Sequence, residues 1–401
     1  MSNLYAALEI GTTRTVLAIG EARAGERLKV TCHAEIPSSG VRKSQILNIA
    51  DATRSIHSVL HSIEKKQDAL GTKVTIGNAM LVVSGQTIKA DPFSGTAQVS
   101  GSRVGADEIA EVRGLAHQMP LARDRELLDI AEQDYVLDNL GGISEPRGMA
   151  GRVLKLNALH VNADRNRIQD ARTAATEVHL ELPDAVFAAT CAADAVLEDH
   201  ERKNGVLVLD LGGGSTGYAA YIDGYLAAAE VIGVGGDHIT NDIAHAFQTT
   251  NNQAEEMKIK SASAIISRGD DSSPRVPVPG SNPLMESRTV SRHALDTVVN
   301  ARLKELFSVI KERLVRHDLA NRLHAGVVVT GGGAALDGLP ALLEQTLGMN
   351  VRTGRPIHVD GLEDEPHPEA FAAIAGALLC SHRNDDHESM LDGILRRFFR
   401  K

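Results

Sequence analysis

Two short turns of this chain place glycine beside hydroxyl side chains, and each turn follows an apolar segment that ends with an acid. The first lies within Tyr5–Gly20, where Glu9 precedes Gly-Thr-Thr. The second lies within Gly205–Ile222, where Asp210 precedes Gly-Gly-Gly-Ser-Thr. Because glycine permits positive φ and lacks Cβ, successive backbone N–H groups in such turns can point at one anion. The residues predicted to bind phosphate are Gly11, Thr12 and Thr13 in the first turn and Gly212, Gly213, Gly214 and Ser215 in the second.

The acid before each turn suits a divalent cation. Glu9 and Asp210 hold equivalent places in two segments that both read as strand, acid, glycine turn and strand. A carboxylate at this place can hold a hydrated Mg²⁺ ion that offsets phosphate charge. Asp210 is therefore the candidate catalytic residue and the candidate Mg²⁺ residue, acting through water; an acid that only ties down its turn is the alternative. The repeat of a whole hairpin predicts two related lobes that clamp a polyphosphate between them.

A third glycine cluster follows a short apolar run within Gly326–Pro340. Gly331, Gly332 and Gly333 come after Val-Val-Val-Thr and before the helical pattern of Ala341–Leu347. This order is strand, glycine turn and helix, and a purely structural helix entry is the alternative to a binding role. The P-loop signature G-x-x-x-x-G-K-[ST] is absent from the sequence, and a strand rather than a helix follows the Asp210 turn, which argues against a dinucleotide-binding fold.

The elements that must position these turns are those of an α/β protein. A chain of 401 residues is expected to form two or more lobes. Ser84–Asn162 carries its own strand and helix patterns and is predicted to be an inserted module, and Arg268–Ser287, rich in Pro, Gly and Ser, is predicted to be a loop. Helical spacing of apolar residues predicts helices at Ala50–Lys66, Asp107–His117, Asp164–Thr176, Asp184–His200, Ala254–Ser267 and Arg292–Arg316.

Composition excludes several classes of protein. The net charge of −10 argues against a protein that coats nucleic acid. The three cysteines are scattered without a C-x-x-C pair, so neither a disulfide framework nor a zinc site is expected. The N-terminus lacks the pattern of a secretory signal, and no apolar run reaches the roughly 18 residues that span a bilayer. A cytoplasmic location is expected.

The end of the chain has the pattern of an amphipathic helix. At about 100° per residue, the apolar residues of Ser389–Lys401 fall on one half of a helix and three arginines on the other. Such a helix suits the surface of an anionic membrane, and the polar spacer Ser381–Glu388 would separate it from the body. A terminal helix docked on the protein's own core is the alternative. The predicted membrane residues are Met390, Leu391, Ile394, Leu395, Arg396, Arg397, Phe398, Phe399, Arg400 and Lys401.

Taken in order, these motifs resemble those of the FtsA family, the bacterial actin-like cell-division proteins of the actin-like ATPase superfamily. The two hairpins and the third glycine cluster resemble the phosphate-1, phosphate-2 and adenosine motifs of that superfamily. Other matching segments, which extend the resemblance over the whole chain, are Glu9-Ile-Gly-Thr12, Ser39-Gly-Val-Arg-Lys43, Leu81-Val-Val-Ser-Gly-Gln86, Gly235–Ala244, Glu255 with Lys258, and Pro368–Leu379.

The resemblance implies a two-lobed actin-like fold of the duplicated ribonuclease-H type, with a family-specific inserted subdomain and a C-terminal amphipathic helix. It implies ATP and Mg²⁺ in the cleft, with Gly235 and Gly236 at the nucleotide, Gly331–Gly333 near the adenosine, and Glu255 with Lys258 beside the base or ribose. The implied boundaries are 1–83 with 163–202 for lobe one, 84–162 for the inserted subdomain, 203–246 with 322–380 for lobe two, 247–321 for its subdomain, 381–388 for the linker and 389–401 for the membrane helix.

The resemblance also implies biology: a peripheral protein on the inner face of the cell membrane at the division site, which polymerises with itself, tethers FtsZ filaments and meets other division proteins, with no nucleic-acid partner. Two departures bear on hydrolysis. Gly217 stands where the family often has Asp, and Asp184–Leu197 offers no clear water-positioning Glu or Gln. At most weak ATPase activity is therefore expected. A soluble small-molecule kinase or phosphatase of the same superfold, or a pilus-type membrane-assembly homologue, is the alternative function.

Overall fold

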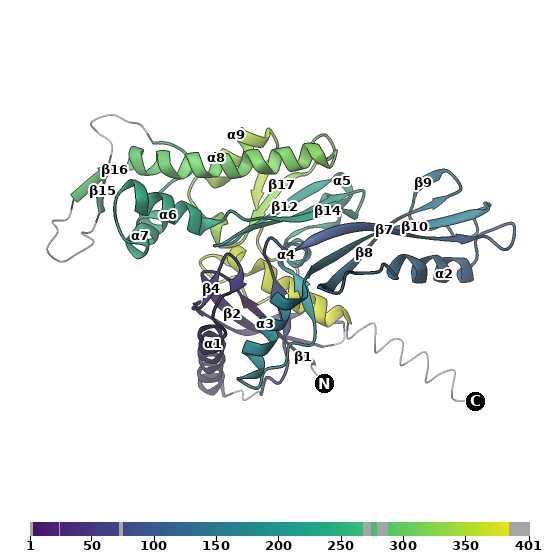
Figure 1. Ribbon diagram of the computed structural model, residues 1–401, viewed down its shortest axis with the longest axis horizontal. Coiled ribbons are helices and arrows are strands. Elements are labelled where there is room, and N and C mark those ends of the chain that lie inside the picture. Colours follow the sequence, from purple (N-terminus) through teal and green to yellow (C-terminus); the bar gives the residue numbers. More distant parts are fainter. Residues whose placement is uncertain (1–2, 24, 72–74, 268–273, 279–287, 385–401) are drawn as a thin grey trace.

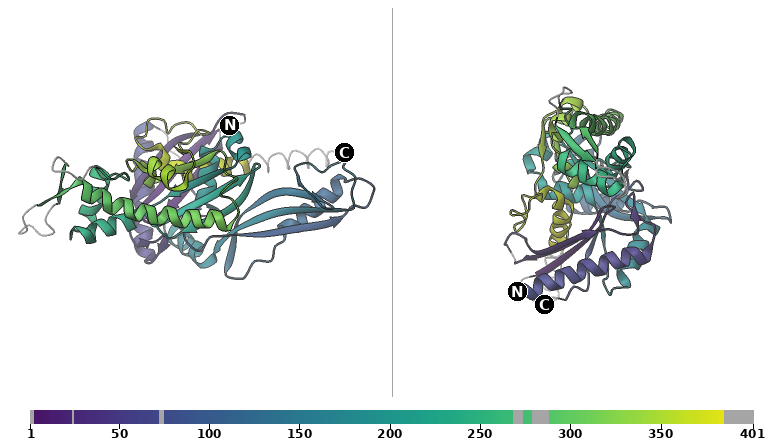
Figure 2. Two further views of the ribbon diagram at one scale, coloured as in Figure 1. Left: turned by 90° about the horizontal axis from the view of Figure 1, so that it is seen from above. Right: turned by 90° about the vertical axis from the view of Figure 1, so that its left-hand side faces the viewer.

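The computed structural model describes residues 3–23, 25–71, 75–267, 274–278 and 288–384. In Figure 1 one lobe lies below, a second lobe lies above it, and an elongated module projects to the right. Each lobe has a sheet as its centre. The left view of Figure 2 shows the module extending away from the two lobes, and the right view shows one lobe above the other.

Lobe one is built on a five-stranded sheet with the order β11-β6-β1-β2-β3. Its long helix α1 begins at the cap residue Asn48, whose side chain accepts a hydrogen bond from the backbone of Asp51, and ends at Gly71 in the left-handed region. The elements are β1 (Asn3–Ile10), β2 (Arg14–Ala22), β3 (Lys29–Pro37), β4 (Val41–Arg42), β5 (Gln45–Ile46), α1 (Ile49–Leu70), β6 (Met80–Val83), α3 (Arg165–Thr176) and β11 (Ala185–Phe187).

Lobe two is built on a second five-stranded sheet, with the order β14-β13-β12-β17-β18. Helices α6 to α9 pack on it, and a small two-stranded sheet lies at its far end (Figure 1). The elements are β12 (Val206–Leu211), β13 (Thr216–Ile222), β14 (Tyr225–Ile232), α6 (Gly236–Ala246), α7 (Asn251–Ser261), β15 (Arg275–Val278), β16 (Arg288–Ser291), α8 (Arg292–Arg316), β17 (Gly326–Thr330), the 3₁₀ helix η1 (Gly332–Ala335), α9 (Leu339–Leu347) and β18 (Val351–Thr353).

The two sheets repeat one topology. Strand β1 pairs antiparallel with β2 and parallel with β6, and β12 pairs antiparallel with β13 and parallel with β17. Glu9 lies opposite Val16 and Asp210 opposite Gly217, each one residue before the end of its strand. The predicted duplication of a hairpin lobe is therefore confirmed, and the two acids occupy matching positions.

The inserted module has its own sheet, with the order β7-β10-β8-β9, and its own core. Helix α2 lies so close to β7 that a Cβ on Gly95 would be 2.2 Å from the carbonyl oxygen of Val112. Val112, Leu154 and Leu156 are fully buried between the helix and the sheet. The elements are β7 (Lys89–Gln98), α2 (Ala106–His117), β8 (Arg125–Leu137), β9 (Leu140–Ile143) and β10 (Val153–Asp164).

Two helices connect the lobes. They are α4 (Ala188–Val196) and the helix over residues 372–384, which follows the 3₁₀ helix η2 (Pro368–Phe371). A Cβ on Gly376 would lie 1.7 Å from the carbonyl oxygen of Cys191, so these helices pack with their backbones in contact. Nearby, the short helix α5 (Asp199–Asn204) is joined to β18 by the ion pair of Glu201 with Arg352, at 2.6 Å.

Three sequence expectations for secondary structure are wrong in detail. The single helix expected at Asp184–His200 is instead β11, α4 and α5, because Ala185–Phe187 pairs with β6 at the edge of the sheet. The helix expected at Ala254–Ser267 runs from Asn251 to Ser261, and Ala262 after it is extended. Part of the predicted loop Arg268–Ser287 forms β15, because the valines of Arg-Val-Pro-Val are buried.

The predicted linker 381–388 also needs correction. Residues 381–384 continue the last helix, and Arg383 forms an ion pair with Asp194 of α4. The predicted membrane segment Ser389–Lys401 lies outside the described residues. Within the part of the chain that is described, no helix combines the length and apolar character needed to cross a membrane.

Candidate functional site

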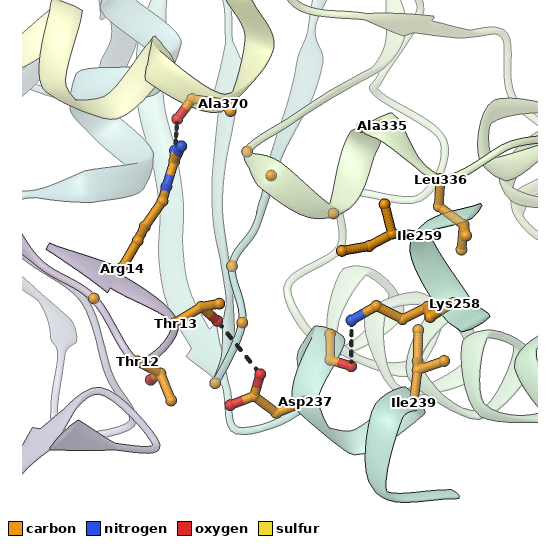
Figure 3. A pocket seen from close by; sticks show the side chains of 18 of the residues that line it. Thr12, Thr13, Arg14, Asp237, Ile239, Lys258, Ile259, Ala335, Leu336 and Ala370 are labelled. Carbon is orange, nitrogen blue, oxygen red and sulfur yellow. Dashed lines mark hydrogen bonds between the residues drawn. The ribbon is translucent and has the colours of Figure 1, made fainter. Parts of the chain in front are cut away.

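A cavity of about 570 Å³ lies between the two lobes. Residues from β1, the glycine turns, α6, α7 and the third glycine cluster all face it (Figure 3). The predicted site residues that line it are Glu9, Gly11, Thr12, Thr13, Asp210, Gly212, Gly213, Gly214, Ser215, Gly236, Glu255, Lys258, Gly331, Gly332 and Gly333.

At one end of the cavity the two glycine turns approach each other across the cleft. A Cβ on Gly213 would lie 1.9 Å from Oγ1 of Thr13, and a Cβ on Gly214 would lie 2.3 Å from Oγ1 of Thr12. Since real Cβ contacts this short do not occur, only glycine allows lobe two to come so near the hydroxyls of lobe one. Hydroxyl and backbone groups from both lobes therefore lie close together at this end of the cavity.

The second glycine turn, Gly212–Ser215, is hydrogen-bonded to the start of α6. The backbone N–H of Gly236 donates to the carbonyl oxygen of Gly212 at 3.0 Å, and that of Asp237 donates to Gly213 at 2.8 Å. A Cβ on Gly235 would lie 2.5 Å from the Gly213 carbonyl oxygen. The resemblance implied that Gly235 lies at the nucleotide. In the structure Gly235 does not line this cavity, and its lack of a Cβ instead permits the close backbone contact.

The two carboxylates interact electrostatically inside the cleft. Burial, with the negative charge of Glu9 second, raises the pKa of Asp210 to about 7, against the opposing effect of Arg14. Burial likewise raises the pKa of Glu9, and Arg14 again opposes it. The negative charge of Glu9 thus disfavours the charged form of Asp210, and a cation beside Asp210 would offset this effect.

Arg14 directly follows the first glycine turn and was not among the predicted site residues. Its guanidinium forms an ion pair with Glu35 and donates a hydrogen bond to the carbonyl oxygen of Ala370. It also lies over the ring of Phe371, 5.1 Å from the centroid. The first turn is thereby connected to the start of the last helix (Figure 3).

The third glycine cluster has two different physical reasons for glycine. Gly331 has φ +82°, and a Cβ there would lie 2.4 Å from Oδ1 of Asp210 and 2.7 Å from the Leu211 carbonyl oxygen. A Cβ on Gly332 would meet nothing within 4 Å. Gly331 thus allows β17 to pass beside Asp210, whereas Gly332 leaves space within the cavity.

The opposite end of the cavity is apolar. Ile239 of α6, Ile259 of α7, and Ala335 and Leu336 after the glycine cluster line it (Figure 3). Ile259 is 71% exposed, which is unusual for a large apolar side chain. No sequence motif marks these residues, because they come from separate elements.

Lys258 lies between the two ends. Its Nζ donates to Oε2 of Glu255 at 2.7 Å, to Oγ1 of Thr240 at 2.9 Å and to the carbonyl oxygen of Gly236 at 3.2 Å. The Lys258 side chain is only 14% exposed, and its positive charge is balanced by the carboxylate of Glu255. Lys258 and Glu255, which the sequence placed together, form one polar cluster that connects α7 to the start of α6.

Gly217, the first departure noted in the sequence, lies on β13 against lobe one. A Cβ there would be 3.1 Å from Cβ of Ala189 and 3.5 Å from Cζ of Phe187. A larger side chain would push against α4. Within α4 the charged residue Asp194 pairs with Arg202 and Arg383 and does not line the cavity.

Comparison with known proteins decides the family. The chain is 32% identical to "Cell division protein FtsA" of Pseudomonas aeruginosa over 373 residues, which are 93% of this chain and 88% of that relative. The chain belongs to the FtsA family. Its FtsA resemblance is also seen with "Cell division protein FtsA" of Escherichia coli K12, at 27% identity over 96% of this chain and 92% of the relative.

Family models and solved structures extend this result. The model for "Cell division protein FtsA" matches residues 207–376, and the model for "SHS2 domain inserted in FTSA" matches residues 85–162. The fold is shared with the "PilM-PilN type IV pilus biogenesis complex" (TM-score 0.64, 19% identity, 94% of this chain and 97% of that one). It is also shared with MreB5 of Spiroplasma citri bound to ADP (TM-score 0.54, 13% identity, 96% and 98%). The predicted actin-like fold with an FtsA-type inserted domain is confirmed.

Proposed function

We propose that this FtsA-family protein binds Mg·ATP in the cavity between its lobes. The observation that carries the proposal is the meeting of two glycine turns, one from each lobe, whose Thr12, Thr13 and Ser215 line the same end of the cavity. An anion held by both turns would join the lobes, and a polyphosphate is long enough to reach donors on both. Asp210 and Glu9 lie beside that end.

The donor set also fits a divalent cation. Burial, and after it the negative charge of Glu9, raises the pKa of Asp210, and the positive charge of Arg14 opposes this rise. Within the described residues no group of three His, Cys, Asp or Glu side chains forms a metal cluster. We propose that Mg²⁺ is held by Asp210 through water and by phosphate oxygens. When bound, the ion would neutralise phosphate charge.

The apolar end of the cavity supplies the complementary half of a nucleotide site. Ile239, Ile259 and Leu336 offer surface to a planar base, and the Glu255–Lys258 pair offers polar groups to a ribose. Gly332 leaves room for the adenosine, since a Cβ there would enter open space. Hydrolysis is proposed to be weak at most, because α4 carries no Glu or Gln and Gly217 carries no carboxylate.

We further propose assembly on the inner face of the cell membrane, with tethering of FtsZ filaments at the division site. Membership in the FtsA family supports a division role. The sequence Ser389-Met-Leu-Asp-Gly-Ile-Leu-Arg-Arg-Phe-Phe-Arg-Lys401 supports a peripheral attachment to anionic lipid. Self-assembly would multiply such weak anchors into stable attachment.

Co-sedimentation with liposomes tests the proposal. The full chain is mixed with anionic or neutral liposomes, with and without Mg·ATP and purified FtsZ, and the pellet is analysed for both proteins. We expect FtsZ to pellet with anionic liposomes only when this protein is present, and more so with Mg·ATP. A separate titration with a fluorescent ATP analogue measures nucleotide binding. If FtsZ stays in the supernatant under all conditions, the tethering proposal is wrong, whatever the nucleotide result.

A further inference from the structure

The inserted module belongs to lobe one by its chain but rests on lobe two. It leaves β6 at Ser84 and returns through β10 to α3, both ends being in lobe one. Its strands β7, β8 and β10 nevertheless pack against β14, the edge strand of the lobe-two sheet. The module is therefore joined to lobe one through its chain ends and to lobe two through β14, and it projects from the two lobes (Figures 1 and 2).

The first residue of the module reaches the phosphate-2 turn. Oγ of Ser84 lies 3.3 Å from Oγ of Ser215, and both residues line the cavity. Ser215 is buried, and its hydroxyl is also 3.1 Å from Oγ of Ser44 in the β4–β5 turn. A ligand that takes the Ser215 hydroxyl would change the partner that Ser84 has in lobe two.

Gln86 makes a second contact, at the end of β14. The side chain lies against Gly233, so that a Cβ on Gly233 would be 1.4 Å from Nε2 of Gln86. Only glycine leaves room for the amide there. The segment after Gly233 is connected to the phosphate-2 turn, because Oγ1 of Thr216 donates to the carbonyl oxygen of Val234 at 2.7 Å.

Gln133 makes a third contact, near the other end of β14. Its Nε2 donates to the carbonyl oxygen of Leu226 at 2.7 Å. Leu226 and Gly233 are about 23 Å apart along an extended chain. Two contacts separated by that distance resist rotation of the module about β14, which one contact would allow.

We propose that Gln86 and Gln133 hold the inserted module to lobe two, so that the orientation of the module follows the closure of the cleft on a nucleotide. A change at Ser215 in the second glycine turn would alter the contact of Ser84 at the start of the module. This inference rests on the proposed nucleotide binding. It makes the module's direction, and hence any assembly contact it carries, dependent on the occupancy of the cavity.

Pulsed electron paramagnetic resonance tests the inference. Spin labels are placed on Leu140→Cys in the module and Leu47→Cys in lobe one, between β5 and α1, where the native side chains are 60% and 66% exposed. Cys32 and Cys191 are buried, and a sample with only the native cysteines measures background labelling of the partly exposed Cys380. The distance is recorded with and without Mg·ATP in the full chain.

The decisive variant is Gln86→Ala with Gln133→Ala, and the matched control is Gln98→Ala with Gln118→Ala, two exposed glutamines of the same module. We expect the decisive variant to broaden the distance distribution without nucleotide and to lose the shift caused by Mg·ATP. Its affinity for a fluorescent ATP analogue should stay within about threefold of the control. Gly233→Ala should reproduce the loss, because its Cβ displaces Gln86.

The outcomes separate the inference from the proposed function. Nucleotide that binds to the parent protein without shifting the distance overturns the inference and leaves nucleotide binding intact. The inference is also wrong if the decisive variant keeps both the narrow distance distribution and the distance shift caused by Mg·ATP. If the parent protein does not bind nucleotide, the proposed function is wrong, and so is the dependence of the module's orientation on nucleotide. The width of the distance distribution without nucleotide then still decides whether the two glutamines hold the module.

Discussion

The hydroxyl of Thr13 in lobe one donates a hydrogen bond to Oδ1 of Asp237 in lobe two, at 3.4 Å (Figure 3). Asp237 lies in the first turn of α6, where the partial positive charge of a helix N-terminus favours a carboxylate. The contact places the start of α6 beside both glycine turns. The two lobes thus meet directly at the end of the cavity proposed to bind phosphate.

The pH dependence of stability should reveal Asp210. Its pKa in the folded protein is raised to about 7, so between about pH 4 and 7 the folded state binds a proton that the unfolded state releases. Stability therefore falls as pH rises through this window and levels off above it. Asp210→Asn should remove this contribution to the slope. The difference in free energy of unfolding between the variant and the parent should therefore favour the variant by about 1–3 kcal/mol more at pH 8 than at pH 4.5.

Urea denaturation of the nucleotide-free protein at several pH values measures this slope. A parent protein whose stability does not fall between pH 4.5 and 7, relative to Asp210→Asn, would contradict the assignment. Mg·ATP should bind Asp210→Asn more weakly than the parent at pH 8, by about 2 kcal/mol, because a charge-assisted contact is lost.

The glycine of the second turn should be essential for closure. Gly213→Ala places a Cβ 1.9 Å from the Thr13 hydroxyl and 3.2 Å from Cβ of Thr13, so the Thr13 side chain must rotate or the lobes must separate at this point. We expect a loss of about 1–3 kcal/mol in stability together with weaker nucleotide binding. Adding Thr13→Ala to Gly213→Ala should recover part of the stability, since the clashing atom is removed.

Gly332→Ala is the matched control for the glycine prediction. Its Cβ meets nothing within 4 Å, so the fold should be as stable as the parent, while nucleotide affinity falls if the adenosine occupies that space. Thermal unfolding and the nucleotide titration distinguish the two effects. Equal stability of Gly213→Ala and Gly332→Ala would show that the turns do not need to approach as described.

Replacement of Lys258 should affect the nucleotide more than the fold. Lys258→Met removes the partner of Glu255 and three hydrogen bonds at the centre of the cavity. We expect weaker binding of a fluorescent ATP analogue, by about 1.5–3 kcal/mol. Lys304→Met on α8, an exposed lysine outside the cavity lining, is the control and should bind normally. Equal affinities of the two variants would exclude Lys258 from the site.

The C-terminal segment should govern attachment to lipid. Deleting Ser389–Lys401, or changing Phe398 and Phe399 to Glu, should release the protein from anionic liposomes without altering ATP affinity. The four basic residues contribute about 1 kcal/mol each near such a surface, so high salt should weaken attachment of the intact protein. Flotation of the truncated protein with liposomes would show that another surface is the anchor.

The sequence by itself determined the parts of the protein whose physics is local. Each glycine turn depends on contacts within the turn itself: a Cβ on Gly11 would lie 2.8 Å from the carbonyl oxygen of Arg14, and a Cβ on Gly212 would lie 3.0 Å from that of Ser215. The acid before each turn, the duplicated lobes and the inserted module followed from the same local patterns. The family motifs then located Glu255 and Lys258 beside each other on one helix face.

Only the tertiary structure decided which distant residues meet. Ala185–Phe187 is a strand rather than part of a helix because the edge of β6 was available to it, and no local pattern records that. Ile239, Ile259 and Leu336 form one apolar surface although no spacing connects them. Gly233 has no room for a Cβ because Gln86 of the inserted module lies against it. Such contacts depend on how the lobes pack, and packing is set by the whole chain at once.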